Sequence, residues 1–299
     1  MRHAAPTHRR PGPRPRPILS LWGLDRVGTL SFVVIAVVLG CIALAPFLTG
    51  YPEQGLGTPG PDRLVAPSSE HIMGTDRLGR DLWARILYGG RLSVLLAVLV
   101  VSLAVIIGTP LGIIAGYFGG WVDEVIMRVV DVFLAFPPLL LAIFLSALLG
   151  PGLLNLVLAI GLGWWPWYTR IARAQVLSYR QRPFVEAAEF MGVHPVTIMR
   201  RHLLPFVGTP VMIQSTLDLG SAILTVAALS FLGLGLPPPT PDWGQIISEG
   251  RVYFPDRWWY VTFPGLAIFT VALAFNLLGD SIRHSRESEH SRATNHDPS

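Results

Sequence analysis

Residues 184–205 read FVEAAEFMGVHPVTIMRRHLLP, a polar, arginine-containing stretch in an otherwise apolar chain. The segments on either side are apolar and long enough to cross a bilayer as helices, which takes about 20 residues each. This stretch must therefore emerge from the membrane on one face. A helix-turn-helix of this length is too short to be a domain, so it predicts a contact site for a soluble partner protein.

Local signals predict how this stretch folds. A helix is expected over residues 184–191, because Pro183 supplies the fixed φ of a first turn and alanines favour helix. Glu186 lies near the start of this helix, where its charge complements the helix dipole. Gly192 can end the helix in a left-handed conformation, and a second short helix can follow from Pro195.

Composition places the whole chain in the membrane. Of 299 residues, 51% are hydrophobic and 14% are charged, with a mean hydropathy of +0.50, whereas soluble domains carry about 25% charged residues. The chain contains no lysine, so it cannot carry the P-loop, whose lysine reaches the phosphates of ATP. The single Cys41 cannot form an internal disulfide, and no H-E-x-x-H or G-x-S-x-G motif points to a metalloprotease or serine hydrolase.

We expect an all-α, polytopic membrane helix bundle with about six transmembrane helices. The apolar runs cover residues 27–48, 92–115, 125–149, 153–171, 207–232 and 261–278. An even number of spans puts both termini on one side, and that side carries 16 of the 23 arginines. Because positive charge favours the cytoplasmic side, both termini and residues 184–205 are expected to be cytoplasmic.

The chain divides by composition into four parts. The start is rich in Pro and Arg and is expected to be disordered. The first apolar run could be a cleaved secretory signal, but it exceeds the usual signal core of about 7–15 residues, which favours a retained span. The expected parts are a cytoplasmic tail (1–26), a first span with an extracytoplasmic loop (27–90), a core membrane domain (91–282) and a polar cytoplasmic tail (283–299).

Two details concern aromatic residues and prolines. Trp258 and Trp259 precede the last apolar run, where tryptophan usually anchors a helix at the membrane interface. The sequence Phe136-Pro137-Pro138 interrupts the third run and is expected to bend it.

One set of residues resembles a known family. Glu186-Ala187-Ala188, Gly192 and Leu204-Pro205 match the EAA loop of the inner-membrane permeases of binding-protein-dependent ABC importers. The general pattern has Ile where this chain has His202. A polar residue there is frequent in the oligopeptide, dipeptide and nickel branch, so the departure favours that branch.

Three further stretches resemble the same branch and extend the resemblance over roughly residues 70–283. They are Gly74-Thr75-Asp76 with Gly79-Arg80-Asp81, the turn from Gly116 to Asp131, and the segment from Leu229 to Asp280. Four collinear blocks are far more specific than an EAA loop alone. The resemblance implies the transmembrane domain of a type I ABC importer and, within it, the C-type permease subunit.

The family pattern also implies the partners. These are a homologous B-type permease, one or two ATPase subunits that hold ATP and Mg²⁺, an extracytoplasmic substrate-binding protein and the lipid bilayer of the inner membrane. It implies no cofactor on this chain, no nucleic acid and no enzymatic activity of its own. Val226 stands where many members have Glu, which favours dipeptides over longer peptides. Nickel, glutathione and other small solutes stay open.

The resemblance assigns roles within the loop. Glu186 would make polar contacts with the ATPase, and Ala187 and Ala188 belong to the docking helix. Gly192 would be required for the backbone conformation that ends this helix. Leu204-Pro205 would restart the next span at a fixed angle. The alternative for this stretch is a solvated amphipathic connector without a partner.

Asp218 lies well inside the fifth apolar run, beside Gln214. It is either a pathway-lining or inter-subunit group or one half of a helix-helix hydrogen bond. A rival hypothesis is an ion-driven secondary transporter, which would depend on protonation of Asp218 or Asp131. One such residue is poor support for a proton relay, which needs ionisable groups along a path.

Overall fold

The computed structural model describes residues 25–294, with side chains through residue 285. The predicted N-terminal tail lies outside the described residues except for its last two positions, as do residues 295–299. The described chain is helical and has no strand, only an isolated antiparallel bridge between Thr75 and Asp81. This confirms the all-α membrane bundle.

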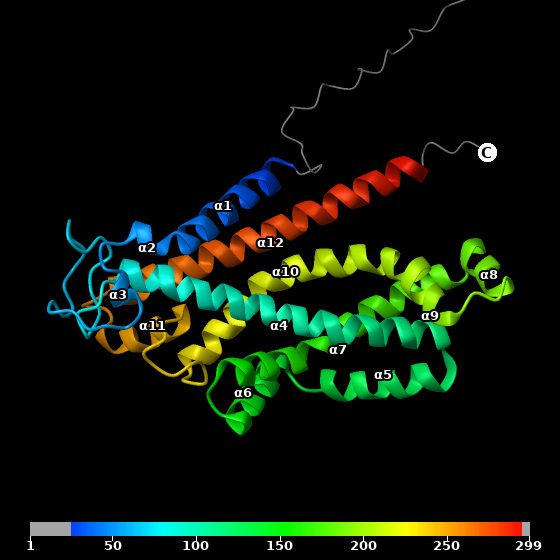
Figure 1. Ribbon diagram of the computed structural model, residues 1–299, viewed down its shortest axis with the longest axis horizontal. Helices are drawn as coiled ribbons and strands as arrows, with labels where there is room; N and C mark the ends of the chain where they lie inside the picture. Colours follow the sequence, from blue (N-terminus) through cyan, green and yellow to red (C-terminus); the bar gives the residue numbers. More distant parts are fainter. Residues whose placement is uncertain (1–24, 295–299) are drawn as a thin grey trace, which may run out of the picture.

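Twelve α-helices follow one another along the described chain, with a π-helical segment (Ile198–Leu203) and a 3-10 turn (Arg251–Tyr253) between them. Figure 1 shows an elongated bundle with α3 and α11 at one end and α8 at the other. We call these the α11 end and the α8 end. The helices are α1 (Arg26–Ala43), α2 (Ala45–Leu48), α3 (Pro52–Gly55), α4 (Leu82–Phe118), α5 (Gly120–Leu134), α6 (Pro138–Leu149), α7 (Leu153–Arg180), α8 (Pro183–Phe190), α9 (Pro195–Thr197), α10 (Leu204–Phe231), α11 (Trp243–Gly250) and α12 (Trp259–Thr294).

The structure has a helix or a helix pair at each of the six expected spans: α1, α4, α5 with α6, α7, α10 and α12. Four stretches are long and apolar enough to cross a membrane: α1, α4, the run ending in α10, and α12. A fifth is added if α5 and α6 form one broken span. The fourth expected span became the first part of α7, whose later turns contain three tryptophans, Pro166 and Arg170 and so dilute its apolar character.

The predicted bend in the third span is confirmed. The axes of α5 and α6 differ by 85° across residues 135–137. Pro137 and Pro138 explain the break, since proline disfavours helical backbone in the residue before it and donates no backbone hydrogen bond. Pro138 then occupies the first turn of α6, where its missing N–H costs nothing.

The core of the bundle is the extensive contact between α4 and α7. Gly108, Gly112 and Gly116 recur every fourth residue on α4 and leave a groove along its face toward α7. A methyl group on either of the first two would overlap the carbonyl oxygen of Trp165 or Thr169. Small residues at this spacing let two membrane helices approach backbone to backbone, which is how such helices associate without a hydrophobic driving force.

Many large apolar side chains point outward. Ile106 on α4, Phe144 on α6 and Phe269 on α12 are each more than 60% exposed. Soluble monomers rarely expose large contiguous apolar patches, whereas a membrane protein covers them with lipid. The exterior therefore agrees with a multi-pass membrane protein.

Candidate functional site

The EAA loop (residues 183–205) forms the α8 end of the molecule (Figure 1). Its first helix, α8, begins at Pro183 and ends just before Gly192, whose φ is +73°. The N–H of Gly192 donates to the Glu189 carbonyl at 2.9 Å and that of Val193 to the Ala188 carbonyl at 3.0 Å. This paired pattern is a Schellman C-cap, so the helix and the left-handed glycine expected from the sequence are both present.

The two faces of α8 differ. Val185 and Ala188 are buried against the bundle, whereas Glu186 and Ala187 face outward. Beyond them Phe190 is 90% exposed and Met191 is 76% exposed. Of the predicted loop residues, only Ala188 anchors the helix to the rest of the chain.

The second arm of the loop is less regular than expected. The short α9 gives way to the π-helical segment Ile198–Leu203, and α10 continues from it at Leu204 without a break, with Pro205 in its first turn. Ile198 and Leu203 are buried, while Leu204 is 40% exposed. A π-helical turn inside a helical run frequently marks a functional site.

Aromatic stacking holds the base of the loop. The rings of Tyr179, at the end of α7, and Phe206, at the start of α10, stack with centroids 4.5 Å apart. Phe184 of α8 packs on the same Phe206 ring at 5.5 Å. Three helices therefore meet on the Phe206 side chain.

A membrane polar cluster (Tyr168, Gln214 and Asp218) lies midway along the bundle. The Tyr168 hydroxyl of α7 donates to Asp218 Oδ2 of α10 at 2.6 Å. The amide of Gln214 donates to Asp218 Oδ1 at 2.9 Å. Asp218 and Gln214 thus come together as predicted, and the helix-helix hydrogen bond that the sequence left open is present. Tyr168 was missed, because nothing in the sequence shows that it faces α10.

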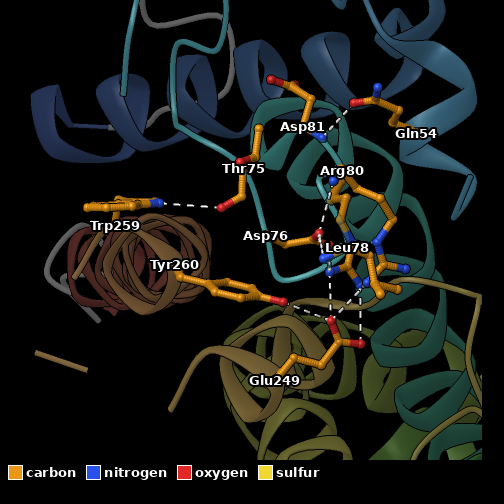
Figure 2. A network of polar contacts seen from close by, with 10 residues as sticks. Gln54, Thr75, Asp76, Leu78, Arg80, Asp81, Glu249, Trp259 and Tyr260 are labelled. Carbon is orange, nitrogen blue, oxygen red and sulfur yellow. Dashed lines mark hydrogen bonds and ion pairs between the residues drawn. The ribbon is translucent and has the colours of Figure 1, made fainter. Parts of the chain in front are cut away.

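The α11 end contains an ion network of Asp76, Arg80, Arg85, Glu249 and Tyr260. Figure 2 labels all of its members except Arg85. Arg85 Nη1 lies 2.7 Å from Asp76 Oδ2 and 2.8 Å from Glu249 Oε2. Arg80 contacts the same two carboxylates, through Nε at 2.6 Å and Nη2 at 3.0 Å. The Tyr260 hydroxyl donates to Glu249 at 3.0 Å. Two arginines balance two carboxylates, and Arg85 and Asp76 have fully buried side chains.

The ion network sets the ionisation of Glu249, which lies in α11 outside the spans. Burial alone would raise the pKa of this carboxyl. The charges and hydrogen bonds of Arg85, and then those of Arg80, outweigh the burial, so the pKa is held below its ordinary value. Glu249 is therefore an anion at neutral pH.

A second layer of contacts orders the loop before α4 (Figure 2). Asp81 caps α4 by accepting the Ala84 N–H at 2.8 Å, and its own N–H donates to Gln54 Oε1 at 2.8 Å. Trp259 is buried and its indole N–H donates to the Thr75 carbonyl at 3.4 Å. Interface anchoring is therefore the wrong interpretation for Trp259, because protein covers it, while Trp258 is 47% exposed.

Sequence reasoning assigned no role to the ion network. It singled out the Gly74–Asp81 segment only as a resemblance. Alternating Asp and Arg in an outer loop was the one available signal, but Glu249 lies 164 residues beyond Arg85. Within the described residues no group of three or more His, Cys, Asp or Glu side chains is arranged to hold a metal ion.

Comparisons with known proteins agree with this architecture. A family model described as "Binding-protein-dependent transport system inner membrane component" matches residues 108–285. The dipeptide transport system permease protein DppC of Alkalihalophilus pseudofirmus is 44% identical over 85% of this chain and 81% of that protein. The probable D,D-dipeptide permease DdpC of Escherichia coli is 42% identical over 85% and 84%, and its nickel permease NikC is 39% identical over 85% and 91%.

Among solved structures, an inward-facing methionine ABC transporter, MetNI, aligns with a TM-score of 0.54 at 18% identity, covering 66% of this chain and 94% of that one. This likeness shows the fold alone, that of a type I ABC importer transmembrane domain. The chain belongs to the family of binding-protein-dependent transport system inner membrane components, as a C-type permease of the peptide and nickel importer branch.

Proposed function

We propose that this chain imports short peptides, with dipeptides as the principal substrate, as one of two permease subunits in an ABC importer. The second subunit is a homologous B-type permease, and one or two ATPase subunits hydrolyse Mg²⁺-ATP. An extracytoplasmic binding protein delivers the substrate. The observation that carries this proposal is the exposed EAA loop, which is built at its base into the start of the membrane helix α10.

The loop provides a docking surface of the helix-in-groove kind. Phe190 and Met191 project from the tip of α8 and would enter an apolar groove on an ATPase subunit. Glu186 and Ala187 share the outward face, where Glu186 would make polar contacts at the rim. The chemistry of phosphoryl transfer belongs to the ATPase.

Continuity between loop and membrane would convert this docking into movement. Movement of α8 reaches α10 through the Phe184–Phe206 contact and through the π-helical segment that precedes Leu204. Gly192 and Pro205 fix the directions in which the two arms of the loop leave the turn. Helix α10 carries Asp218, so the same displacement moves the membrane polar cluster.

The proposed orientation places the α8 end in the cytoplasm together with both termini. Arginine asymmetry supports this assignment, because the stretches expected on that side of the membrane carry 16 of the 23 arginines. The α11 end would then face the binding protein, with the ion network holding its loops in one conformation.

Relatives support the choice of substrate. Two of the three named relatives are dipeptide permeases by name. The nickel permease is 39% identical, so nickel is the alternative to test.

The test is uptake of labelled dipeptide into proteoliposomes that contain both permeases, the ATPases and the binding protein. We compare the native chain with Glu186→Arg and with the matched charge reversal Glu124→Arg, whose side chain is 67% exposed on α5 and outside the loop. ATP-dependent uptake that collapses only in Glu186→Arg supports the proposal.

Two other outcomes have distinct meanings. Uptake by this chain alone, driven by an ion gradient and indifferent to ATP, contradicts the proposal in favour of a secondary transporter. A complex that hydrolyses ATP but takes up nickel and no dipeptide overturns the substrate while leaving the coupling role intact.

A further inference from the structure

A cavity opens at the bend between α5 and α6, where it meets α7 and α10. Its volume is about 230 Å³. The lining residues are Leu134, Pro138, Gly163, Trp164, Trp167, Asp218 and Ser221.

Asp218 is the one ionisable side chain in this lining. Each of its oxygens accepts one hydrogen bond, from Tyr168 and from Gln214. A carboxylate accepts about four, so each oxygen retains an acceptor site. No arginine or histidine within the described residues lies at ion-pair distance from Asp218. A carboxylate inside a membrane segment is costly without a counter-charge, so a cation from outside the chain would stabilise Asp218 in its charged form.

The walls of the cavity suit an organic cation. Trp164 and Trp167 line it, and Trp167 is 50% exposed, so the indole face is open. Indole rings attract ammonium groups through their quadrupole, and a carboxylate supplies the opposite charge. Leu134 and Pro138 add an apolar wall that fits an aliphatic or aromatic group attached to the cation.

We propose that this cavity binds the amino-terminal ammonium group of a peptide in transit, with Asp218 as its counter-charge and Trp164 and Trp167 beside it. The inference rests on the proposed peptide import and adds a site within the membrane. Sites for whole drug-sized ligands usually measure about 300–1,000 Å³. The cavity is smaller, so it takes the amino terminus with its first side chain and leaves the rest of the peptide outside the cavity.

The remaining acceptor sites on Asp218 set the strength of binding. Tyr168 and Gln214 orient the carboxylate and already use half of its acceptor capacity, which leaves moderate affinity for the ammonium. A transit site has to be favourable enough to enter and weak enough to leave.

The test is equilibrium binding of radiolabelled alaninamide to the complete permease–ATPase complex in lipid nanodiscs, without the binding protein. Alaninamide has a free ammonium group and no carboxylate, and N-acetyl-alaninamide is the uncharged control. We expect saturable binding of alaninamide alone, at least tenfold weaker in Asp218→Asn and largely retained in Asp218→Glu. Trp167→Ala should weaken it severalfold, whereas Tyr168→Phe, which leaves the carboxylate in place, should not abolish it.

Three results overturn the inference. One is the absence of saturable alaninamide binding to the native complex. Another is equal binding by Asp218→Asn. The third is loss of the B-type permease from the Asp218→Asn complex, which would make Asp218 a subunit contact. Failure of peptide uptake with intact alaninamide binding would count against the proposed substrate and not against the site, so the two hypotheses fail separately.

Discussion

The ion network at the α11 end and the tip of α8 at the other end differ in whether their side chains find partners within the chain. At the α11 end, Arg85 is fully buried and pairs with Asp76 and Glu249, so the charges cancel within the chain. At the α8 end, Phe190 and Met191 are 90% and 76% exposed. The ion network finds all its partners within the chain, whereas the tip of α8 presents two apolar side chains that another molecule can cover.

This difference predicts opposite responses to mutation. A buried charge that loses its partner is left uncompensated, which destabilises the fold directly. An exposed apolar side chain contributes little to the isolated chain, and its loss matters only when the partner is bound. Stability and coupling should therefore be separable by position.

The largest effect is expected for Arg85→Met. The variant leaves Asp76 and Glu249 buried with Arg80 as their only cation, at a cost of about 3–5 kcal/mol in the free energy of unfolding. Thermal unfolding in detergent measures it. Arg128→Met is the control, since its pair with Glu124 has side chains 77% and 67% exposed and contributes below about 1 kcal/mol. Equal stability of the two variants would contradict the contrast between the ends.

Phe190→Asp should act on assembly and leave the fold intact. A buried aromatic anchor at an interface is worth about 2 kcal/mol or more, so ATPase affinity should fall about 30-fold with unchanged thermal unfolding of the chain. Co-purification and titration with the ATPase measure it. Phe254→Asp, 58% exposed near the α11 end, is the matched control and should bind normally. Unfolding of Phe190→Asp would show that the side chain supports the fold instead.

Glu249→Gln tests the ion network through the pH dependence of the free energy of unfolding. Because the pKa of Glu249 is lower in the folded chain than its ordinary value of 4.5, its contribution is complete above that value and is lost as pH falls through the folded pKa. At neutral pH the free energy of unfolding of the variant should be about 1.5 kcal/mol lower than that of the native chain. The variant should also lack the loss of stability that protonation of Glu249 causes in acid. Unfolding measured from pH 7 downward tests it, and identical slopes for both chains would refute the role of Glu249.

The smallest effect is expected for Gly192→Ala. A methyl group meets no heavy atom within 4 Å, so the cost is only the left-handed backbone at φ +73°, about 1 kcal/mol. ATP-coupled uptake should fall about fivefold, the equivalent of that energy. Gly208→Ala, on α10 with open space and no positive φ, should be neutral. A larger loss in Gly208→Ala than in Gly192→Ala would remove the backbone explanation.

The sequence alone determined what depends on local chemistry. Composition placed the chain in a membrane, and Pro183 and Gly192 marked the two ends of α8, because capping acts over five residues or fewer. The prolines before α6 predicted its bend for the same reason. The loop motif and three collinear stretches led to the family.

Only the tertiary structure decided which distant residues meet. Arg85 and Glu249 are 164 residues apart, and Tyr168 and Asp218 are 50 apart. No local pattern encodes such pairs, since they depend on how closely glycines let α4 approach α7 and on which faces of α7 and α10 then meet. Apolar runs give the length of a span, but only the tertiary structure shows how the third run divides into α5 and α6 and how the mixed helix α7 packs along α4.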